Sequence, residues 1–161
     1  MTQSRKRRRN LYVHSDHADL LRGADLRVTR PRLAVLEAVQ GQPHADTDTI
    51  FGVVRTVLPD VSRQAVYDVL AALTAVGLVR KIQPSGSVAR YESRVGDNHH
   101  HIVCRSCGSI ADVDCAVGEA PCLVPFDPAG DLEGFVVDEA EVVYWGVCPE
   151  CSLKEISRSQ P

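Results

Sequence analysis

The chain has 161 residues, which is enough for one ordinary domain or two small ones. Apolar residues make up 44% of it and aromatic residues only 5%, so Val, Leu, Ile and Ala must build the core. The formal net charge of −3 does not by itself indicate a nucleic-acid partner. No apolar stretch approaches the roughly 18 residues that a membrane span needs, and the segment after the basic N-terminus is too polar for a secretory signal. We therefore expect a cytoplasmic protein with no membrane partner.

Charge is distributed unevenly along the chain. Residues 5–9 form a basic run, whereas acidic residues collect after Asp112. Residues 1–14 carry charge and little that could be buried, which predicts a basic flexible arm. The arm is either a solubilising tail or a segment that lies along DNA phosphates. We interpret His14 and His17 as surface residues.

Two amphipathic helices are expected before residue 60. Thr29 caps the first, and Pro31 lies in its first turn, where a missing N–H costs nothing. A polar loop over residues 40–46 ends this helix, and the second begins at Thr47 or Asp48 and ends before Pro59. Apolar residues at helical spacing should face the core: Leu33, Leu36 and Val39 in the first helix, and Ile50, Val54, Val57 and Leu58 in the second.

A third helix is delimited most clearly of all. Ser62 is a good N-cap, and Gly77 lies where a left-handed C-cap belongs. Two β-rich runs, 78–82 and 88–92, then flank a Gly-containing turn, which predicts a hairpin. The expected buried stripe of the helix consists of Ala65, Val66, Val69, Leu70, Leu73 and Val76.

Three helices followed by a hairpin is the order of a winged helix-turn-helix domain, here over residues 15–93. In that geometry the third helix enters the major groove of double-stranded DNA. Arg63 and Gln64 suit base edges, while Ser62 and Tyr67 suit phosphate oxygens. The same pattern also fits an ordinary three-helix domain whose polar face meets water.

The composition changes after a polar, Gly-containing hinge at residues 94–98. Short β-like runs follow at 110–113, 134–137 and 142–147, and the Pro-containing stretch 119–130 is expected to be a loop. We predict a small α/β domain over residues 99–153 and a tail over 154–161. The fold class is therefore α+β, with a winged helix-turn-helix domain followed by a small α/β domain.

Two Cys-x-x-Cys motifs are the strongest chemical signal: Cys104 with Cys107, and Cys148 with Cys151. Together they supply a tetrahedron of thiolates for zinc, and we expect two β-hairpin ends to bring them together across the 40 intervening residues. Two disulfides, which a reducing compartment disfavours, or a dithiol redox centre are the alternatives. Cys115 and Cys122 remain as small apolar residues or as candidate redox thiols.

A run of three histidines precedes the first cysteine pair. If it lies on a strand, His99 and His101 share one face and His100 points to the other. Two imidazoles with carboxylates nearby make a nitrogen–oxygen site that suits Fe(II), Mn(II) or Zn(II). A solvated turn is the alternative. The nearby donors considered are His44, Glu92 and Asp112.

A zinc enzyme of the nucleobase deaminase type needs His-x-Glu followed by Pro-Cys-x-x-Cys. Here His44 is followed by Ala45 and Asp46, and neither cysteine pair has a preceding proline. Four cysteines on one ion also leave no open position for water. We therefore expect that the protein is not an enzyme and has no small-molecule substrate. A zinc-ribbon interaction module without DNA affinity is a further alternative, against which the polar face of the third helix argues.

Over residues 18–152 the chain resembles the ferric uptake regulator (Fur) family in the order, spacing and type of its motifs. The resemblance is carried by VTRPR (28–32), VYDVL (66–70), RYE (90–92), HHHIVCRSCG (99–108) and YWGVCPEC (144–151). It implies a DNA-binding repressor that forms a homodimer through its C-terminal domain. In many iron-uptake regulators an extra metal site uses a histidine where this chain has Ala140, so that site lacks one ligand here.

The resemblance also implies particular site residues. The structural zinc ligands would be Cys104, Cys107, Cys148 and Cys151. The regulatory metal ligands would be His44, Glu92, His99, His101 and Asp112. The DNA contacts would include Tyr67 of the recognition helix, to which we add Arg30, Arg32, Ser62, Arg63 and Gln64.

The sequence at residues 96–98 and 138–141 is similar to that of members of the actinobacterial branch that controls catalase-peroxidase genes. The expected function is thus a metal-dependent, peroxide-responsive repressor of catalase and oxidative-stress genes, holding Fe2+ or Mn2+, with Zn2+ as a further option. Oxidation of His44 or His99 would release it from operator DNA, or oxidation of Cys115, Cys122 or a zinc cysteine in a thiol-switch variant. The alternative is an iron- or zinc-uptake repressor that uses the same site as a plain metal sensor.

Overall fold

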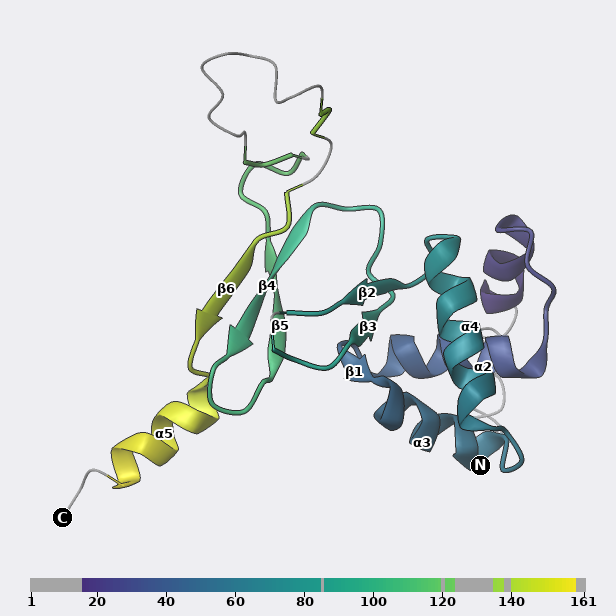
Figure 1. Ribbon diagram of the computed structural model, residues 1–161, viewed down its shortest axis with the longest axis horizontal. Coiled ribbons are helices and arrows are strands. Elements are labelled where there is room, and N and C mark those ends of the chain that lie inside the picture. Colours follow the sequence, from purple (N-terminus) through teal and green to yellow (C-terminus); the bar gives the residue numbers. More distant parts are fainter. Residues whose placement is uncertain (1–15, 85, 120, 124–134, 138–139, 159–161) are drawn as a thin grey trace, which may run out of the picture. The chain divides into compact units, whose positions relative to one another are not determined.

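The structure, a computed structural model, describes residues 16–84, 86–119, 121–123, 135–137 and 140–158 (Figure 1). The chain divides into two compact units, Met1–Val95 and Gly96–Pro161, each described by itself below. The division falls inside the segment that the sequence analysis assigns to a hinge. The basic arm over residues 1–14 lies outside the described residues, as does most of the expected loop over 119–130.

Three helices form the body of the first unit, after a short helical segment at residues 16–23. They are α2 (Arg30–Gly41), α3 (Thr47–Val57) and α4 (Arg63–Ala75). Each begins at a side chain that accepts a hydrogen bond from the backbone N–H three residues on: Thr29, Asp46 and Ser62. These bonds satisfy N–H groups that have no partner within the helix. The caps predicted at Thr29 and Ser62 are thereby confirmed.

The end of α4 follows the predicted pattern as well. Gly77 has a φ of 71°, the left-handed conformation that glycine adopts without steric cost. The backbone N–H of Leu78 donates to the carbonyl oxygen of Leu73 at 3.0 Å, which satisfies a carbonyl that the helix leaves open. The chain therefore turns sharply into strand β2.

The core of the first unit lies among these helices. Its fully buried side chains include Leu36, Val39, Ile50, Val54, Val66, Leu70 and Leu73, as predicted. Val57 and Val76 were expected in the core and are 59% and 38% exposed. Both lie at the C-terminal end of a helix, beyond the packed neighbours. The surface assignment of His17 is also wrong, because it is 1% exposed and its Nε2 lies 2.6 Å from Oε1 of Gln40.

A three-stranded antiparallel sheet completes the first unit. It consists of β1 (Ala45–Asp46), β2 (Arg80–Ile82) and β3 (Arg90–Glu92), with β3 in the centre. The predicted hairpin is confirmed in β2 and β3, which are shorter than the β-rich runs. Strand β1 was not predicted, because only two residues of a polar loop form it.

The second unit is built on another three-stranded sheet (Figure 1). Central β4 (His99–Cys104) pairs antiparallel with β5 (Ile110–Asp114) and parallel with β6 (Val143–Gly146). The strands expected at 110–113 and 142–147 are confirmed, whereas described residues 135–137 of the second β-like run, 134–137, form no strand. Helix α5 (Pro149–Arg158) follows β6 and was not predicted. The fold is the predicted winged helix-turn-helix with a small α/β unit, and no helix within the described ranges is suited to cross a membrane.

Candidate metal centres and nucleic-acid interface

The two cysteine pairs come together at one end of the second sheet. Parallel pairing places Cys104 at the end of β4 beside Gly146 at the end of β6, two residues before Cys148. The four sulfur atoms lie within 4.8 Å of one another, and Cys107 Sγ is 3.7 Å from Cys148 Sγ. A zinc ion with bonds of about 2.3 Å needs sulfurs about 3.8 Å apart, so the spacing fits a tetrahedral thiolate centre and not a disulfide.

The expected meeting of two β-hairpin ends is half correct. The first pair lies in the hairpin between β4 and β5, where Gly108 has a φ of 73° and its N–H donates to the Cys104 carbonyl oxygen at 2.9 Å. The second pair lies at the turn from β6 into α5 instead. The spacing of each Cys-x-x-Cys motif predicts a metal-binding turn, but it does not distinguish a hairpin from a strand–helix turn.

The pKa values of Cys104, Cys107 and Cys151 are shifted in different directions. Backbone N–H groups of Cys148 and Cys107 donate to the Cys104 sulfur and lower its pKa to about 6. The hydroxyl of Ser109 lowers the pKa of Cys107 as well. For Cys151, a hydrogen bond from Ser106 lowers the pKa, but the neighbouring thiols and burial outweigh it and raise the pKa to about 11. Adjacent thiolates repel one another without a cation, so this pattern is the one that a bound divalent ion would relieve.

In the first unit, His44 and Glu92 form a buried pair. His44 Nε2 lies 3.0 Å from Glu92 Oε2, and the two side chains are 11% and 1% exposed. The register of β1 and β3 explains their meeting, since Ala45 pairs with Tyr91 and the next positions outward are His44 and Glu92. His44 has a φ of 61°, a left-handed conformation that histidine adopts more readily than most residues. The pair offers one imidazole nitrogen and one carboxylate to a cation.

In the second unit, β4 places two imidazoles on one face, as the alternation predicted. The rings of His99 and His101 lie 5.0 Å apart, and both residues are buried. Asp112 pairs with His101 across β4 and β5, with 3.8 Å between Oδ1 and the imidazole Nε2. Asp97 Oδ1 lies 2.8 Å from His99 Nδ1, the kind of second contact that orients a metal-binding histidine. Asp97 was not selected in the sequence analysis. Its position two residues before His99 was the signal that could have indicated this contact.

His100 points to the opposite face of β4. Its Nε2 lies 3.2 Å from Cys122 Sγ, and the two atoms form a cluster with the Cys115 sulfur. Sequence reasoning placed His100 away from its neighbours but assigned it no partner. A backbone N–H from Gly118 is the main cause that lowers the pKa of Cys115.

The candidate DNA-reading side chains lie on the exposed side of α4. Ser62, Arg63, Gln64 and Tyr67 are all exposed. Arg63 forms an ion pair with Asp48 and lies over the ring of Phe51, and Gln64 donates to Asp68 Oδ1 at 2.8 Å. The guanidinium and the amide are therefore held by neighbours on the protein surface. Of the candidates outside α4, Arg30 is exposed, and Arg32 donates to the Arg27 carbonyl oxygen at 2.8 Å.

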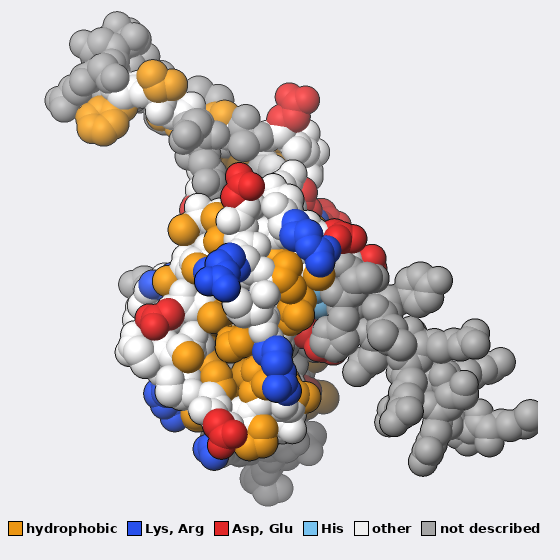
Figure 2. Space-filling view, turned by 90° about the vertical axis from the view of Figure 1, so that its right-hand side faces the viewer, with side chains coloured by type: hydrophobic (Ala, Val, Ile, Leu, Met, Phe, Trp, Pro, Cys, Tyr) orange, Lys and Arg blue, Asp and Glu red, His pale blue; other side chains and the backbone are white. Residues whose placement is uncertain are grey.

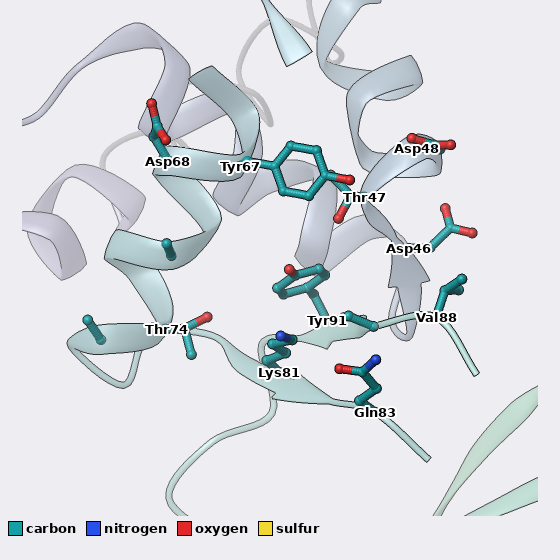
Figure 3. Close-up of a pocket in the computed structure, with 13 residues that line it drawn as sticks. Asp46, Thr47, Asp48, Tyr67, Asp68, Thr74, Lys81, Gln83, Val88 and Tyr91 are labelled. Carbon is teal, nitrogen blue, oxygen red and sulfur yellow. The ribbon is translucent and has the colours of Figure 1, made fainter. Parts of the chain in front are cut away.

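A cleft of about 780 Å³ runs between α4 and the first sheet (Figure 3). Tyr67 from α4 and Tyr91 from β3 project into it, and Lys81 lies at its edge. Lys and Arg side chains lie at separate places among apolar ones on the face shown in Figure 2. In helix-turn-helix domains, the second helix of the motif lies in the major groove of DNA.

Known proteins share the sequence motifs and the fold described above. Residues 23–119 match the model of the ferric uptake regulator family. The chain belongs to that family. It is 77% identical to the transcriptional regulator FurA of Mycobacterium tuberculosis over 91% of this chain and 97% of the relative. It is 30% identical to the peroxide operon regulator of Bacillus subtilis over 85% of this chain and 92% of the relative.

Solved structures of the ferric uptake regulator family share the fold. That of Helicobacter pylori Fur superposes with a TM-score of 0.62 at 19% identity, covering 88% of this chain and 92% of the other. The protein is thus a Fur-family, metal-responsive transcriptional regulator. Members of the family bind metal ions and act as dimeric DNA-binding regulators.

Proposed function

We propose that this Fur-family regulator is a metal-dependent, peroxide-responsive repressor of catalase and oxidative-stress genes. The observation that carries the proposal is the separation of its donors by chemical type. Four thiols form one centre, whereas the His44–Glu92 pair and the group of His99, His101 and Asp112 offer only nitrogen and oxygen. Soft thiolates suit a permanent zinc, and the nitrogen–oxygen donors suit an exchangeable Fe2+ or Mn2+. We place its action in the cytoplasm, where operator DNA would lie.

The four-cysteine centre is proposed to hold structural Zn2+. Cys104 and Cys107 come from one turn and Cys148 and Cys151 from another, so a bound ion would tie β4 to β6 and α5. A structural zinc of this kind contributes folding free energy, with apparent values of roughly 10–16 kcal/mol in small zinc domains. The ion would thereby stabilise the α/β unit through which we expect the homodimer to form.

The regulatory ion is proposed to be held by His44, Glu92, His99, His101 and Asp112. The first two belong to the winged-helix unit and the others to the α/β unit. An ion shared by donors of both units would favour one arrangement of the units over the others. Two recognition helices in a dimer bind two half-sites only at a defined spacing, so metal loading would select the DNA-competent form.

Peroxide would act through the same residues. Ferrous iron, when bound, supplies the electron that cleaves the O–O bond of peroxide. One-electron cleavage of peroxide yields hydroxide and a hydroxyl radical. The radical would add to a ring carbon of His44 or His99, and loss of one further electron to the ferric ion and of one proton would leave an oxidised ring that no longer serves as a ligand. After loss of one ligand, the ion would no longer favour the DNA-competent arrangement of the units, and the protein would dissociate from the DNA. The 30% identity to the peroxide operon regulator of Bacillus subtilis supports this specificity.

Contacts to the operator are proposed for exposed residues of the winged-helix unit. Arg63 and Gln64 would contact base edges after leaving Asp48 and Asp68, while Ser62 and Tyr67 would contact phosphates. Arg30 and Arg32 would add phosphate contacts beside the helix. The basic arm over residues 1–14 would add a further contact that carries no sequence information.

The second candidate function is iron- or zinc-uptake repression. The same nitrogen–oxygen donors accept several divalent ions, whose selection depends on availability. Membership of a family described as ferric uptake regulators favours this alternative. It differs from the first in one consequence, because a plain metal sensor would leave its histidines unmodified by peroxide.

The proposal is tested by fluorescence anisotropy with labelled operator DNA, selected from genomic fragments, at fixed salt. The wild-type protein should bind in Mn2+ and lose affinity when Mn2+ is withdrawn, with its zinc content unchanged. His44→Ala should abolish the Mn2+ dependence and retain the zinc. Gln42→Ala, which truncates an exposed side chain in the same loop but outside every proposed site, is the matched control. Retained Mn2+-dependent binding by His44→Ala would remove His44 from the site.

A further inference from the structure

The face of β4 opposite the proposed regulatory histidines carries a second group of donors. His100 is 5% exposed, and its Nε2 lies 3.2 Å from Cys122 Sγ. Together with Cys115 Sγ, these atoms lie within 4.8 Å of one another, although Cys115 and Cys122 come from the loop after β5. None of these three residues belongs to the four-cysteine centre or to the regulatory set.

The sheet itself brings His100 and Cys115 together. His100 pairs with Val113 across β4 and β5, so the two side chains share one face. Successive side chains alternate, and Cys115, two residues after Val113, therefore points to the same face. This is the face away from His99 and His101.

The loop after β5 folds back toward His100. Gly118 has a φ of 85°, which reverses the chain, and the amide of Asn98 donates to the Glu119 carbonyl oxygen at 2.9 Å. This bond joins the loop to the start of β4, next to His100, and carries Cys122 to the imidazole. Backbone N–H groups of Gly118 and Val117 donate to the Cys115 sulfur. In the same way, backbone N–H groups donate hydrogen bonds to the Cys104 sulfur in the four-cysteine centre.

We propose that His100, Cys115 and Cys122 form a further metal site for a borderline-soft divalent ion of the zinc class. Bonds of about 2.1 Å to nitrogen and 2.3 Å to sulfur at tetrahedral angles need donors about 3.6–3.8 Å apart, close to the spacing present here. One imidazole and two thiolates leave a fourth position for water. The set is too sulfur-rich for Mn2+ or Mg2+ and lacks the fourth protein ligand of a closed structural site. The ion is therefore exchangeable, unlike the zinc on four cysteines.

The site is tested with Co2+ as the probe, on full-length protein that is reduced, free of oxygen and still contains its four-cysteine zinc. Thiolate ligands give Co2+ a strong near-ultraviolet charge-transfer band, which nitrogen and oxygen ligands do not give. We expect Co2+ to produce this band in the wild-type protein while the zinc content stays constant. Cys115→Ser and Cys122→Ser should each weaken the band, and the double variant should abolish it. His100→Asn should lower the Co2+ affinity by at least about tenfold, a loss that even an outer partner of a ligand can cause.

The matched control is Val117→Ala, which shortens an exposed side chain between Cys115 and Cys122 and should leave the band intact. Circular dichroism and zinc content identify any variant that does not fold. A second measurement needs no variant: Co2+ should protect Cys115 and Cys122 of the wild-type protein from iodoacetamide, as counted by peptide mass spectrometry. No charge-transfer band at constant zinc, a band that persists in the double variant, or alkylation unaffected by Co2+ would each overturn the proposal. So would a Cys115–Cys122 disulfide that persists in the reduced protein.

Discussion

His44 Nε2 and Glu92 Oε2 lie 3.0 Å apart, although 48 positions separate the two residues in the chain. The Glu92 side chain is 1% exposed, and a buried carboxylate is costly unless a partner or a cation compensates it. The short pairing of β1 with β3 holds the imidazole at this carboxylate. The winged-helix unit therefore holds together two of the five residues proposed as ligands of the regulatory ion before any ion binds.

Replacing this carboxylate tests its role. Glu92→Gln keeps the size of the side chain and removes its charge, so we expect Mn2+ affinity to fall by about 10–100-fold. Bound Mn2+ can be counted by electron paramagnetic resonance on protein that retains its zinc. Asp60→Asn is the control, because Asp60 is an exposed acid in the link between α3 and α4. Equal Mn2+ affinity in Glu92→Gln and wild type would exclude Glu92 as a ligand.

Removing the zinc that we propose for the four-cysteine centre should unfold the α/β unit. Cys148→Ser takes away one of four ligands and leaves three thiols crowded without their cation, so we expect loss of bound zinc and of dimer mass. Metal analysis, circular dichroism and light scattering measure the three consequences. Ser152→Ala changes an exposed side chain of the same helix outside the four-cysteine set and should retain the zinc and the dimer. A zinc-free protein with an unchanged spectrum and mass would contradict a structural role.

The N-cap of α3 gives a prediction for stability and pH. Hydrogen bonds from the side chain and then the backbone of Thr49 lower the pKa of Asp46 from its usual 3.8. The native state therefore binds fewer protons than the unfolded chain in mild acid, and the contribution of Asp46 is present above about pH 4 and lost as the pH falls through the lowered pKa. Asp46→Ala should reduce the free energy of unfolding near pH 7 by about 1 kcal/mol.

Asp46→Asn separates charge from capping, because an amide oxygen caps a helix at every pH. The difference in unfolding free energy between wild type and Asp46→Asn should shrink as the pH falls below about 4. Urea denaturation at a series of pH values measures it, and effects of acid on the zinc centre cancel in the difference. A difference that does not depend on pH would show that the charge of Asp46 contributes nothing.

The recognition helix predicts two kinds of DNA-binding variant. Arg63→Ala should relax base preference at one position of the operator, since a bidentate contact discriminates by about 1–3 kcal/mol. Tyr67→Phe removes a phosphate contact and should weaken binding to all sequences alike. Binding to a panel of single-base operator variants distinguishes these outcomes. If Arg63→Ala weakens binding to every operator variant equally, Arg63 contacts the DNA backbone and not a base.

Much of the first unit could be predicted from local signals. Thr29, Ser62 and Gly77 are residues whose side chain or backbone freedom directly determines a helix end, and each lies where expected. Val57 and Val76 continue the apolar periodicity of their helices but lie past the neighbouring elements. Periodicity reports the direction of a side chain and not whether anything covers it.

Less of the site could be predicted, because it depends on pairing between distant segments. Strand alternation placed His99 and His101 on one face, but β1 is too short to give any periodic signal, and β1 is what sets His44 against Glu92. The parallel pairing of β4 with β6 and the start of α5 within the second cysteine pair were likewise not visible locally. The partners of His100 depend on a loop that reverses at Gly118.

The most direct test of the central claim is peptide mass spectrometry after limited peroxide on Fe2+-loaded protein, with Mn2+-loaded protein as the control. We expect one added oxygen on His44 or His99, with iron only, in parallel with loss of operator binding. Unmodified histidines at a peroxide dose that releases the DNA would contradict metal-centred sensing. Oxidised cysteines would then indicate a thiol switch, and an unmodified, DNA-bound protein would indicate a plain metal sensor.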